Sequence, residues 1–477
     1  MIRTLALSLV TLLCLGSSLI AQEKSVFRAG AAKSNITPPL GNSIVGGFRP
    51  YPATHIHDEL HARCLVLDDG KTKLVFAVCD LLGIDRKISD EARDLIQKDL
   101  GIPRSHVMIC ATHTHSACSA LGKDSRIVGQ ELDGYQRFVV VRIVDGVKRA
   151  VNLLRPAQIG FGQASAQEHV FNRRWFLQPG KMKPNPFGKM DKVRMNPPRD
   201  PKVLLKPAGP TDPDIPFLAV REPDGTPISV FTTYSLHYVG RVGPGHVSAD
   251  YFGMYCRELA RLMKADKQTP EFVAMMSNGT SGDINNISFT KPRPPKKPYE
   301  QMKYVADDVA RQVHAALKKV KYRDYVTLDA RYSEPEIRTR KEDAVKLLDW
   351  AKQKLADMPK EPKRLDLSFH YAKRTLRMAE HPEKLKLPLQ VFRIGDASIG
   401  TMPCEIFCEI GLEFKKRSPL QPAWIVSLGH GYFGYLPTPR HHKLGGYETW
   451  LGTNRVEANA SVQMLDRLVE MAKDMKR

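Results

Sequence analysis

Cysteine is scarce in this chain of 477 residues, and no arrangement of it suggests a disulfide framework. Eight cysteines are present, and the seven beyond residue 21 are scattered, odd in number and mostly embedded in apolar runs: Cys64, Cys79, Cys110, Cys118, Cys256, Cys404 and Cys408. Disulfide frameworks belong to small secreted domains, so we interpret most of these cysteines as buried small hydrophobic residues. Cys404 and Cys408 lie four residues apart, but without a second pair they are only a weak metal-binding signal.

Long hydrophobic runs, internal repeats and nucleic-acid-binding motifs are also missing. Beyond residue 21 no segment is long and apolar enough for a transmembrane helix. The net charge of +21 comes largely from residues 181–206, 291–303 and 338–386, which we interpret as solvated loops and helices. Such charge favours peripheral contact with an anionic membrane surface or an acidic polymer at low salt. Without a recognition motif it does not indicate nucleic acid as a partner.

The first 21 residues have the pattern of a secretory signal peptide. Arg3 supplies a positive charge, an apolar run follows over residues 5–15, and small residues lead to Ala21. The run is too short to span a bilayer comfortably, and the alternative is an N-terminal anchor that is not cleaved. We therefore expect a secreted or periplasmic protein, and with no clear linker we expect residues 27–477 to form one catalytic domain.

Six short apolar runs each end in polar residues that are capable of chemistry. They occupy residues 74–79, 107–111, 228–236, 272–276, 397–402 and 424–428. Such runs suit strands buried on both faces, and amphipathic helical patterns occur at residues 90–100, 304–317, 343–355 and 456–475. The alternation predicts an α/β fold with a mixed or parallel sheet, flanking helices and an active site at the carboxyl ends of the strands. The alternative is six ordinary strands that meet loops.

Residues 111–116, Ala-Thr-His-Thr-His-Ser, are the strongest candidate for a metal site. Residues two apart on an extended chain point to the same face, so His113 and His115 can reach one ion or one substrate. About half of such pairs are structural, but the apolar strand before this pair favours function. A hydrolytic zinc site takes about three protein ligands and leaves one position open, so further ligands must come from elsewhere in the chain.

Two other strand ends supply the further ligand candidates. His237 follows the run at residues 228–236. The alternative to a metal ligand at this position is a hydrogen-bonded core histidine. Glu405 follows a buried strand and precedes an amphipathic stretch, where a helix dipole favours an ionised carboxylate; its alternative is simple helix capping. Tyr435 and Tyr447 lie in glycine-rich segments that allow close backbone approach, and a phenol there can ligate metal or donate to a developing oxyanion.

These residues resemble the catalytic domain of the neutral ceramidases, zinc-dependent amidases that cleave the N-acyl bond of ceramide. The likeness spans roughly residues 27–455 and is carried by residues 29–39, 56–58, 62–63 and 111–116. It implies that one zinc ion is held by His113, His237 and Glu405, with Tyr435 at the metal. It further implies that His115 and Arg173 face the substrate and that Tyr447 helps to hold the oxyanion.

The sequence departs from the family pattern in two respects. The family has a serine, assigned as nucleophile, where this chain has Asn285, and no C-terminal immunoglobulin-like domain is expected here. An amide is no such nucleophile, so a zinc-bound water is simpler, with His115 or Asp283 as proton acceptor and Asn285 as a substrate-orienting group. A second ion is left open, with Asp80, His246 and Asp250 as residues that either bind it or only pack.

Three hypotheses about function follow. The first is a secreted zinc amidohydrolase that cleaves an N-acyl amide bond of a ceramide-like lipid. The second keeps the metal and the fold but acts on another extracellular amide or ester, because the family serine is missing. The third is an inactive homologue that binds lipid or polysaccharide. The full set of candidate metal ligands argues against this third hypothesis.

Overall fold

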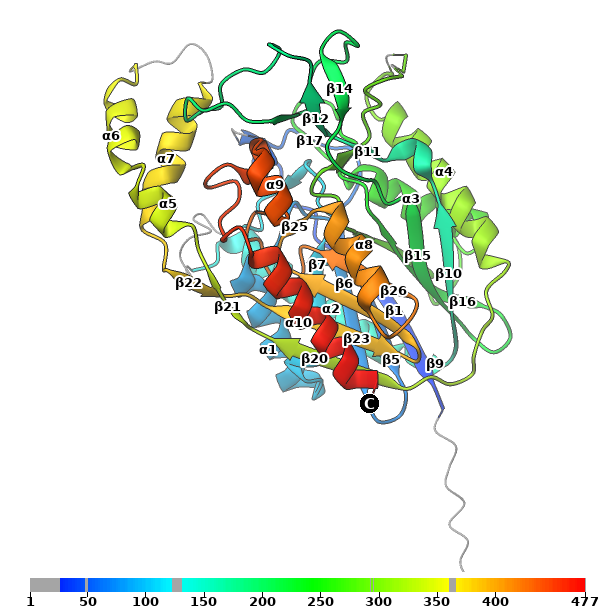
Figure 1. The fold of residues 1–477 in the computed structure, drawn as a ribbon. Helices are drawn as coiled ribbons and strands as arrows, with labels where there is room; N and C mark the ends of the chain where they lie inside the picture. Colours follow the sequence, from blue (N-terminus) through cyan, green and yellow to red (C-terminus); the bar gives the residue numbers. More distant parts are fainter. Residues whose placement is uncertain are drawn as a thin grey trace, which may run out of the picture.

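Three mixed β-sheets surround a shared apolar core (Figure 1). The computed structural model describes residues 26–47, 50–121, 131–291, 293–294, 296–359 and 366–476, so the predicted signal peptide lies outside it. The first sheet contains, in spatial order, β7 (Val107–Ala111), β6 (Lys73–Cys79), β5 (His61–Asp68), β1 (Arg28–Asn35) and β9 (Arg155–Pro156). The second contains β10 (Gln158–Ser165), β15 (Asp214–Arg221), β16 (Pro227–Tyr234) and β18 (Val273–Asn278). The third contains β20 (Leu328–Ser333), β23 (Leu389–Ile394), β24 (Ala397–Met402) and β26 (Ala423–Ser427).

Each sheet is antiparallel except for one parallel pair of strands at its edge. The pairs are β6 with β7, β16 with β18, and β24 with β26. These six strands are the six apolar runs found in the sequence, which confirms the α/β class with mixed sheets. The runs belong to three sheets rather than to one, and each pair of parallel strands delivers two carboxyl ends to the same edge.

Aromatic contacts join the three sheets in the core. The ring of Phe76 on β6 lies 5.5 Å from that of Phe231 on β16 and 4.9 Å from that of Phe392 on β23. All three side chains are almost fully buried. Aromatic pairs at such distances contribute about 0.5–1.5 kcal/mol each beyond area burial, so Phe76 helps to fix the sheets relative to one another.

Helices cover the outer faces of the sheets and bury their apolar stripes there. The helices in question are α1 (Arg86–Leu100) and α2 (Gly134–Asn152) on the first sheet, α3 (Asp250–Leu262) and α4 (Glu300–Leu317) on the second, and α8 (Cys408–Arg417) and α10 (Ala460–Lys476) on the third. Three of the four predicted helices are thereby confirmed, and α1 starts earlier than expected because the Asp85 side chain caps it.

The predicted helix at residues 343–355 is two helices. These are α5 (Lys341–Val345) and α6 (Leu348–Ala356), and α6 packs beside α7 (Leu367–Ala379) at one end of the molecule (Figure 1). Among the described residues, no helix has the length and apolar character needed to cross a membrane. The seven cysteines beyond residue 21 are free and all buried, and their burial confirms the interpretation of most of them as buried small residues.

Candidate metal and active site

His113 lies two residues beyond the end of β7 and has its backbone in the left-handed region, at φ 73°. Its backbone N–H donates to the Leu81 carbonyl at 2.9 Å, and its ring Nδ1 lies 2.7 Å from the Leu82 carbonyl oxygen. Because a carbonyl only accepts, Nδ1 carries the proton and Nε2 keeps a free lone pair. This tautomer is the one that a metal-binding histidine requires.

His237 lies three residues beyond the end of β16 and presents the same tautomer. Its Nδ1 is 3.1 Å from the Ser281 carbonyl oxygen, and its Nε2 is 3.2 Å from Nε2 of His113. Burial, together with the nearby Arg173 guanidinium and the other two histidines, lowers the pKa of His237 well below its usual value. The ring therefore stays neutral and able to ligate a metal ion at physiological pH.

Glu405, the first residue of β25 (Glu405–Ile406), brings a carboxylate to the two histidines. Its Oε2 lies 3.2 Å from Nε2 of His113 and 3.7 Å from Nε2 of His237. Zinc binds such atoms at about 2.0–2.2 Å, so ligand atoms on a tetrahedral ion are about 3.4 Å apart. The three measured separations fit that value, and Oε2 is buried without a hydrogen bond from any described residue.

A hydrogen bond holds the other oxygen of Glu405. Tyr432 OH donates to Oε1 at 2.7 Å. Burial alone would raise the pKa of the Glu405 carboxyl, but His113 and hydrogen bonds from Tyr432 and Tyr435 outweigh it, and the pKa is lowered. The carboxylate is thus ionised, and its free oxygen faces the two imidazoles.

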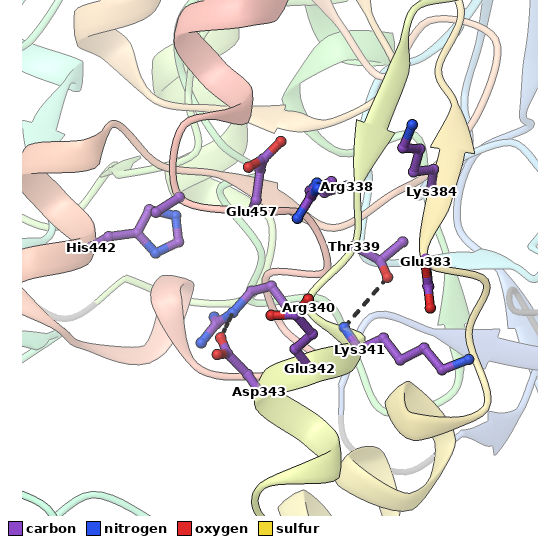
Figure 2. Close-up of a pocket in the computed structure, with 11 residues that line it drawn as sticks. Arg338, Thr339, Arg340, Lys341, Glu342, Asp343, Glu383, Lys384, His442 and Glu457 are labelled. Carbon is purple, nitrogen blue, oxygen red and sulfur yellow. Dashed lines mark hydrogen bonds and ion pairs between the residues drawn. The ribbon is translucent and has the colours of Figure 1, made fainter.

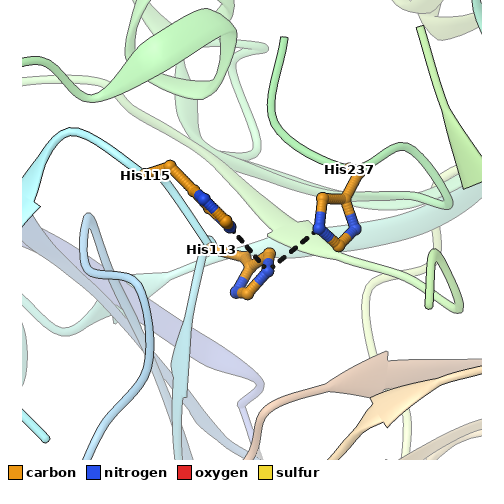
Figure 3. Close-up of side chains that lie close together, drawn as sticks. All are labelled: His113, His115 and His237. Atoms are coloured by element: carbon orange, nitrogen blue, oxygen red, sulfur yellow. Dashed lines mark hydrogen bonds between the residues drawn. The ribbon is translucent and has the colours of Figure 1, made fainter. Parts of the chain in front are cut away.

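His115 joins the same cluster (Figure 3). Its Nε2 lies 3.1 Å from Nε2 of His113, and the ligand nitrogens of His113, His115 and His237 all lie within 4.8 Å of one another. The His115 ring stacks on Tyr238 at 3.6 Å between centroids. Burial, with His113 and Arg173 nearby, lowers its pKa well below the usual value. His115 is therefore compatible both with a fourth metal ligand and with the expected position beside the substrate.

Two tyrosines border this cluster. Tyr435 begins β27 (Tyr435–Leu436), which runs parallel to β25 so that Tyr435 is the direct register partner of Glu405. Tyr447 packs edge-on against Tyr435, with ring centroids 5.8 Å apart. Burial raises the pKa of both phenols, which therefore keep their protons and are able to donate hydrogen bonds.

Arg173 is held in place by Glu448, a residue that the sequence reasoning missed. Arg173 Nε donates to Glu448 Oε1 at 2.9 Å, Arg174 donates to Oε2, and Arg173 Nη2 donates to the Gly282 carbonyl at 2.8 Å. The remaining Nη1 lies 3.4 Å from Nε2 of His237, so one edge of the guanidinium faces the cluster. The adjacent arginines were the only hint in the sequence, and the structure shows that both are buried and therefore need a buried anion.

Asp283 points elsewhere. Its carboxylate accepts from the backbone N–H of Cys408 at 2.9 Å and from Asn172 Nδ2 at 2.8 Å. These contacts turn it toward the N-terminus of α8 rather than toward His113 or His237. Its backbone carbonyl accepts from the N–H of Arg173 at 2.8 Å, so its observed contribution to the site is to fix that arginine's backbone.

Asn285, at the family's serine position, is separated from the pocket by Asn196. It belongs to β19 (Ile284–Asn285), and its Nδ2 donates to Asn196 Oδ1 at 2.6 Å while its Oδ1 accepts from the Ile287 N–H at 3.0 Å. Asn196 lines the pocket described next, whereas Asn285 does not. The structure thus brings Asn196 rather than Asn285 to the pocket surface.

A pocket of about 800 Å³ opens beside the cluster. His115, Arg173, His237, Tyr435 and Tyr447 all line it. Its outer wall is built from residues 182–196, which belong to a positively charged segment that the sequence indicated to be solvated, and from α6 and the start of α7. In that wall Phe187 contacts Trp350 at 5.1 Å between ring centroids, so the loop and the helices meet there.

The residues proposed for a second ion do not converge. Asp80 accepts from Arg63 and the His61 backbone, Asp250 accepts from the Val239 and Gly240 backbone, and His246 bonds to Tyr299. Among the described residues, the other group of three potential ligands is Glu168, His169 and Asp308. A separate hollow of about 420 Å³, shown in Figure 2, is lined by residues such as Arg340, Asp343 and His442 and by none of the predicted site residues.

The fold and a matching family model together place this chain among the ceramidase-like hydrolases. Two solved structures share the fold: neutral ceramidase from Pseudomonas aeruginosa, with a TM-score of 0.67 and 17% identity over 94% of this chain and 74% of that one, and a ceramidase complexed with C2, with a TM-score of 0.67 and 16% identity over 94% and 75%.

The family itself is given by sequence. The family model described as neutral/alkaline non-lysosomal ceramidase, N-terminal, matches residues 27–289, which is more than half of the chain. The chain belongs to this family. His113, His115, Arg173 and His237 lie within the matched residues, whereas Glu405, Tyr435 and Tyr447 lie beyond them and join the cluster through the fold.

Proposed function

We propose that the protein is a zinc-dependent amidohydrolase that cleaves the N-acyl amide bond of a ceramide-like lipid. The observation that carries the proposal is the convergence of His113, His237 and Glu405 at tetrahedral ligand spacing beside a pocket, in a chain of the ceramidase family. His113, His237 and Glu405 would hold the ion, and zinc would supply Lewis-acid polarisation of an acyl carbonyl and a lowered pKa for water at that site.

The chain's own residues supply the other requirements of amide hydrolysis. Neutral His115, 3.1 Å from His113 at the pocket surface, is the candidate that takes a proton from the attacking water. Arg173 and protonated Tyr447 are donors for the negative charge that develops on the carbonyl oxygen. Asp283, bound to the α8 N-terminus, supports the backbone of Arg173 rather than moving protons.

Asn285 favours water over a protein nucleophile. A side-chain amide does not attack carbonyls in the manner of a serine, and Asn196 stands between it and the pocket. The same residue supports a second candidate function, in which the enzyme hydrolyses another extracellular amide or an ester. Export through the N-terminal signal and peripheral contact with an anionic membrane belong to the proposal in both versions.

The decisive experiment couples metal content to turnover. Purified wild-type protein should contain about one zinc per chain and should hydrolyse N-acyl lipids. His113→Ala should lose both properties, whereas His314→Ala, a half-buried histidine on α4, should keep both. A wild-type protein that binds no zinc after reconstitution would refute the proposal. Strong turnover of esters without turnover of ceramide would favour the second candidate function.

A further inference from the structure

Three cationic side chains line the pocket without a carboxylate partner. They are Lys183, Arg194 and Lys354, and within the described part of the chain none of them forms an ion pair. Lys183 is exposed, and the other two are half-buried. Lys354 lies 4.8 Å above the ring of Phe369, which holds its chain at the rim but does not neutralise its charge.

The acidic residues of the same lining are committed to structural hydrogen bonds. Asp191 accepts from Asn185 Nδ2 at 3.0 Å and from Trp450 Nε1 at 2.8 Å. Asp366 caps α7 by accepting from the backbone and the hydroxyl of Ser368 at 2.8 and 2.7 Å. The fourth cation of the lining, Arg173, is paired with Glu448. Lys354 forms no ion pair with Asp366, but its charge helps to lower the pKa of that carboxyl and is therefore partly compensated. The uncompensated positive charge of the lining lies mainly on Arg194 and Lys183.

Of the three cationic residues, Arg194 is the one connected most directly to the metal cluster. It lies on β13 (Val193–Met195), two residues before Asn196, whose backbone N–H donates to the Arg173 carbonyl at 2.8 Å. Arg194 is thus attached through a short, hydrogen-bonded stretch to the residue that faces the metal cluster. A half-buried guanidinium with no anion loses hydration without recovering it, and its planar fork matches a carboxylate or phosphate in two parallel hydrogen bonds.

We propose that the substrate carries an anionic group, which Arg194 binds with help from Lys183 and Lys354. This inference rests on the proposed function and narrows it: the preferred N-acyl amide is an acidic one, in which the amine half bears a carboxylate or a similar anion, rather than an uncharged ceramide. The apolar rings of Phe187 and Trp350 in the same wall offer a surface against which the acyl half of the substrate packs.

The test compares two soluble amides with the same acyl chain, N-octanoylglycine and N-octanoylethanolamine, at concentrations where both are monomeric. The wild type should prefer the carboxylate by about tenfold or more in kcat/KM, as one charge-assisted pair provides. Arg194→Gln should remove that preference by lowering kcat/KM for the carboxylate much more than kcat/KM for the neutral amide. Arg199→Gln, an exposed arginine outside the lining, should behave as wild type, and zinc content should be the same in all three.

Calorimetric binding of the two amides separates this inference from the proposed function. Cleavage of both amides with equal efficiency would overturn the anion subsite and leave the hydrolase standing. If neither these amides nor N-acyl lipids are cleaved, but the carboxylate is bound selectively and Arg194→Gln abolishes that binding, the subsite is upheld and the hydrolase is overturned. Binding of vesicles that contain anionic phospholipid, lost in Arg194→Gln while the soluble amides are not distinguished, would assign the charge to a membrane surface and overturn the inference.

Discussion

Replacing Glu448 tests whether Arg173 must be held rigidly for the site to work. The carboxylate is fully buried and accepts from both Arg173 and Arg174. Glu448→Gln keeps the shape but removes the charge and one acceptor, whereas Glu448→Ala leaves two buried guanidinium groups without their anion. We expect both variants to lose activity, and Glu448→Ala to lose more than Glu448→Gln, because Arg173 would no longer present Nη1 toward His237.

The structure gives the size of the effect. Breaking a buried ion pair by removing one partner costs about 3–5 kcal/mol, a large part of the roughly 5–15 kcal/mol that stabilises a typical domain. Glu448→Ala should therefore unfold at clearly lower denaturant concentration. Glu448→Gln retains one acceptor oxygen and should cost about 1–3 kcal/mol. Loss of one preorganised oxyanion donor lowers kcat by about 100- to 1000-fold, which bounds the effect of a displaced Arg173.

The assay needs stability, metal content and turnover from the same preparations. Urea unfolding reports stability, elemental analysis reports zinc, and hydrolysis of an N-acyl amide separates kcat from KM. Glu470→Gln serves as control, because Glu470 is an exposed glutamate whose ion-pair partner among the described residues is Arg467. If Glu448→Gln retains zinc and full stability with kcat within about twofold of wild type, Glu448 has no positioning role and the argument is refuted.

Three further predictions concern other parts of the molecule. Gly282→Ala puts a Cβ 2.6 Å from the Glu405 carbonyl oxygen, so zinc affinity measured against a chromophoric chelator should fall, and an unchanged affinity would contradict the geometry. Burial lowers the pKa of His61 to about 3 and that of His430 well below its usual value. The unfolded chain then binds protons that the folded chain does not, so the free energy of unfolding of metal-free protein should fall as the pH drops below about 6.5; equal stability at pH 7 and 5 by urea titration would count against this. Trp350→Ala removes a ring from the pocket wall and should raise KM without loss of zinc. A lower KM would refute the idea that this ring contacts the substrate.

Local sequence patterns predicted the strands and their chemistry better than their assembly. The apolar runs before His113, His237 and Glu405 identified buried strands and the residues at their ends. They did not reveal that the strands form three sheets, because pairing between distant segments leaves no local periodicity. The helix predicted at residues 343–355 was wrong in its continuity, since the break between α5 and α6 has no proline or glycine to mark it.

The missed site residues are those whose roles depend on distant partners. Glu448 becomes the anion for Arg173 and Arg174 only because the fold brings together positions about 275 residues apart. Residues 182–196 have the composition of a surface loop, yet they form a pocket wall because α6 and α7 lie opposite. The family likeness supplied Arg173, and the glycine-rich segments indicated Tyr435 and Tyr447, whereas Asn196 and Tyr238 needed the coordinates.

The candidate ligands lie just beyond strands of three separate sheets, β7, β16 and β24, and this placement has a consequence for folding. His113 and His237 are 124 residues apart in the chain, and Glu405 lies further on again. Such non-local contacts form late and slowly, so an incomplete fold cannot offer the tetrahedral set. Metal uptake during refolding should accordingly report the final closure of the three sheets. An ion that binds only the closed chain would then stabilise the fold by about 4 kcal/mol at a thousandfold excess over Kd, so the supply of the proposed zinc ion would help to determine how stable the folded chain is.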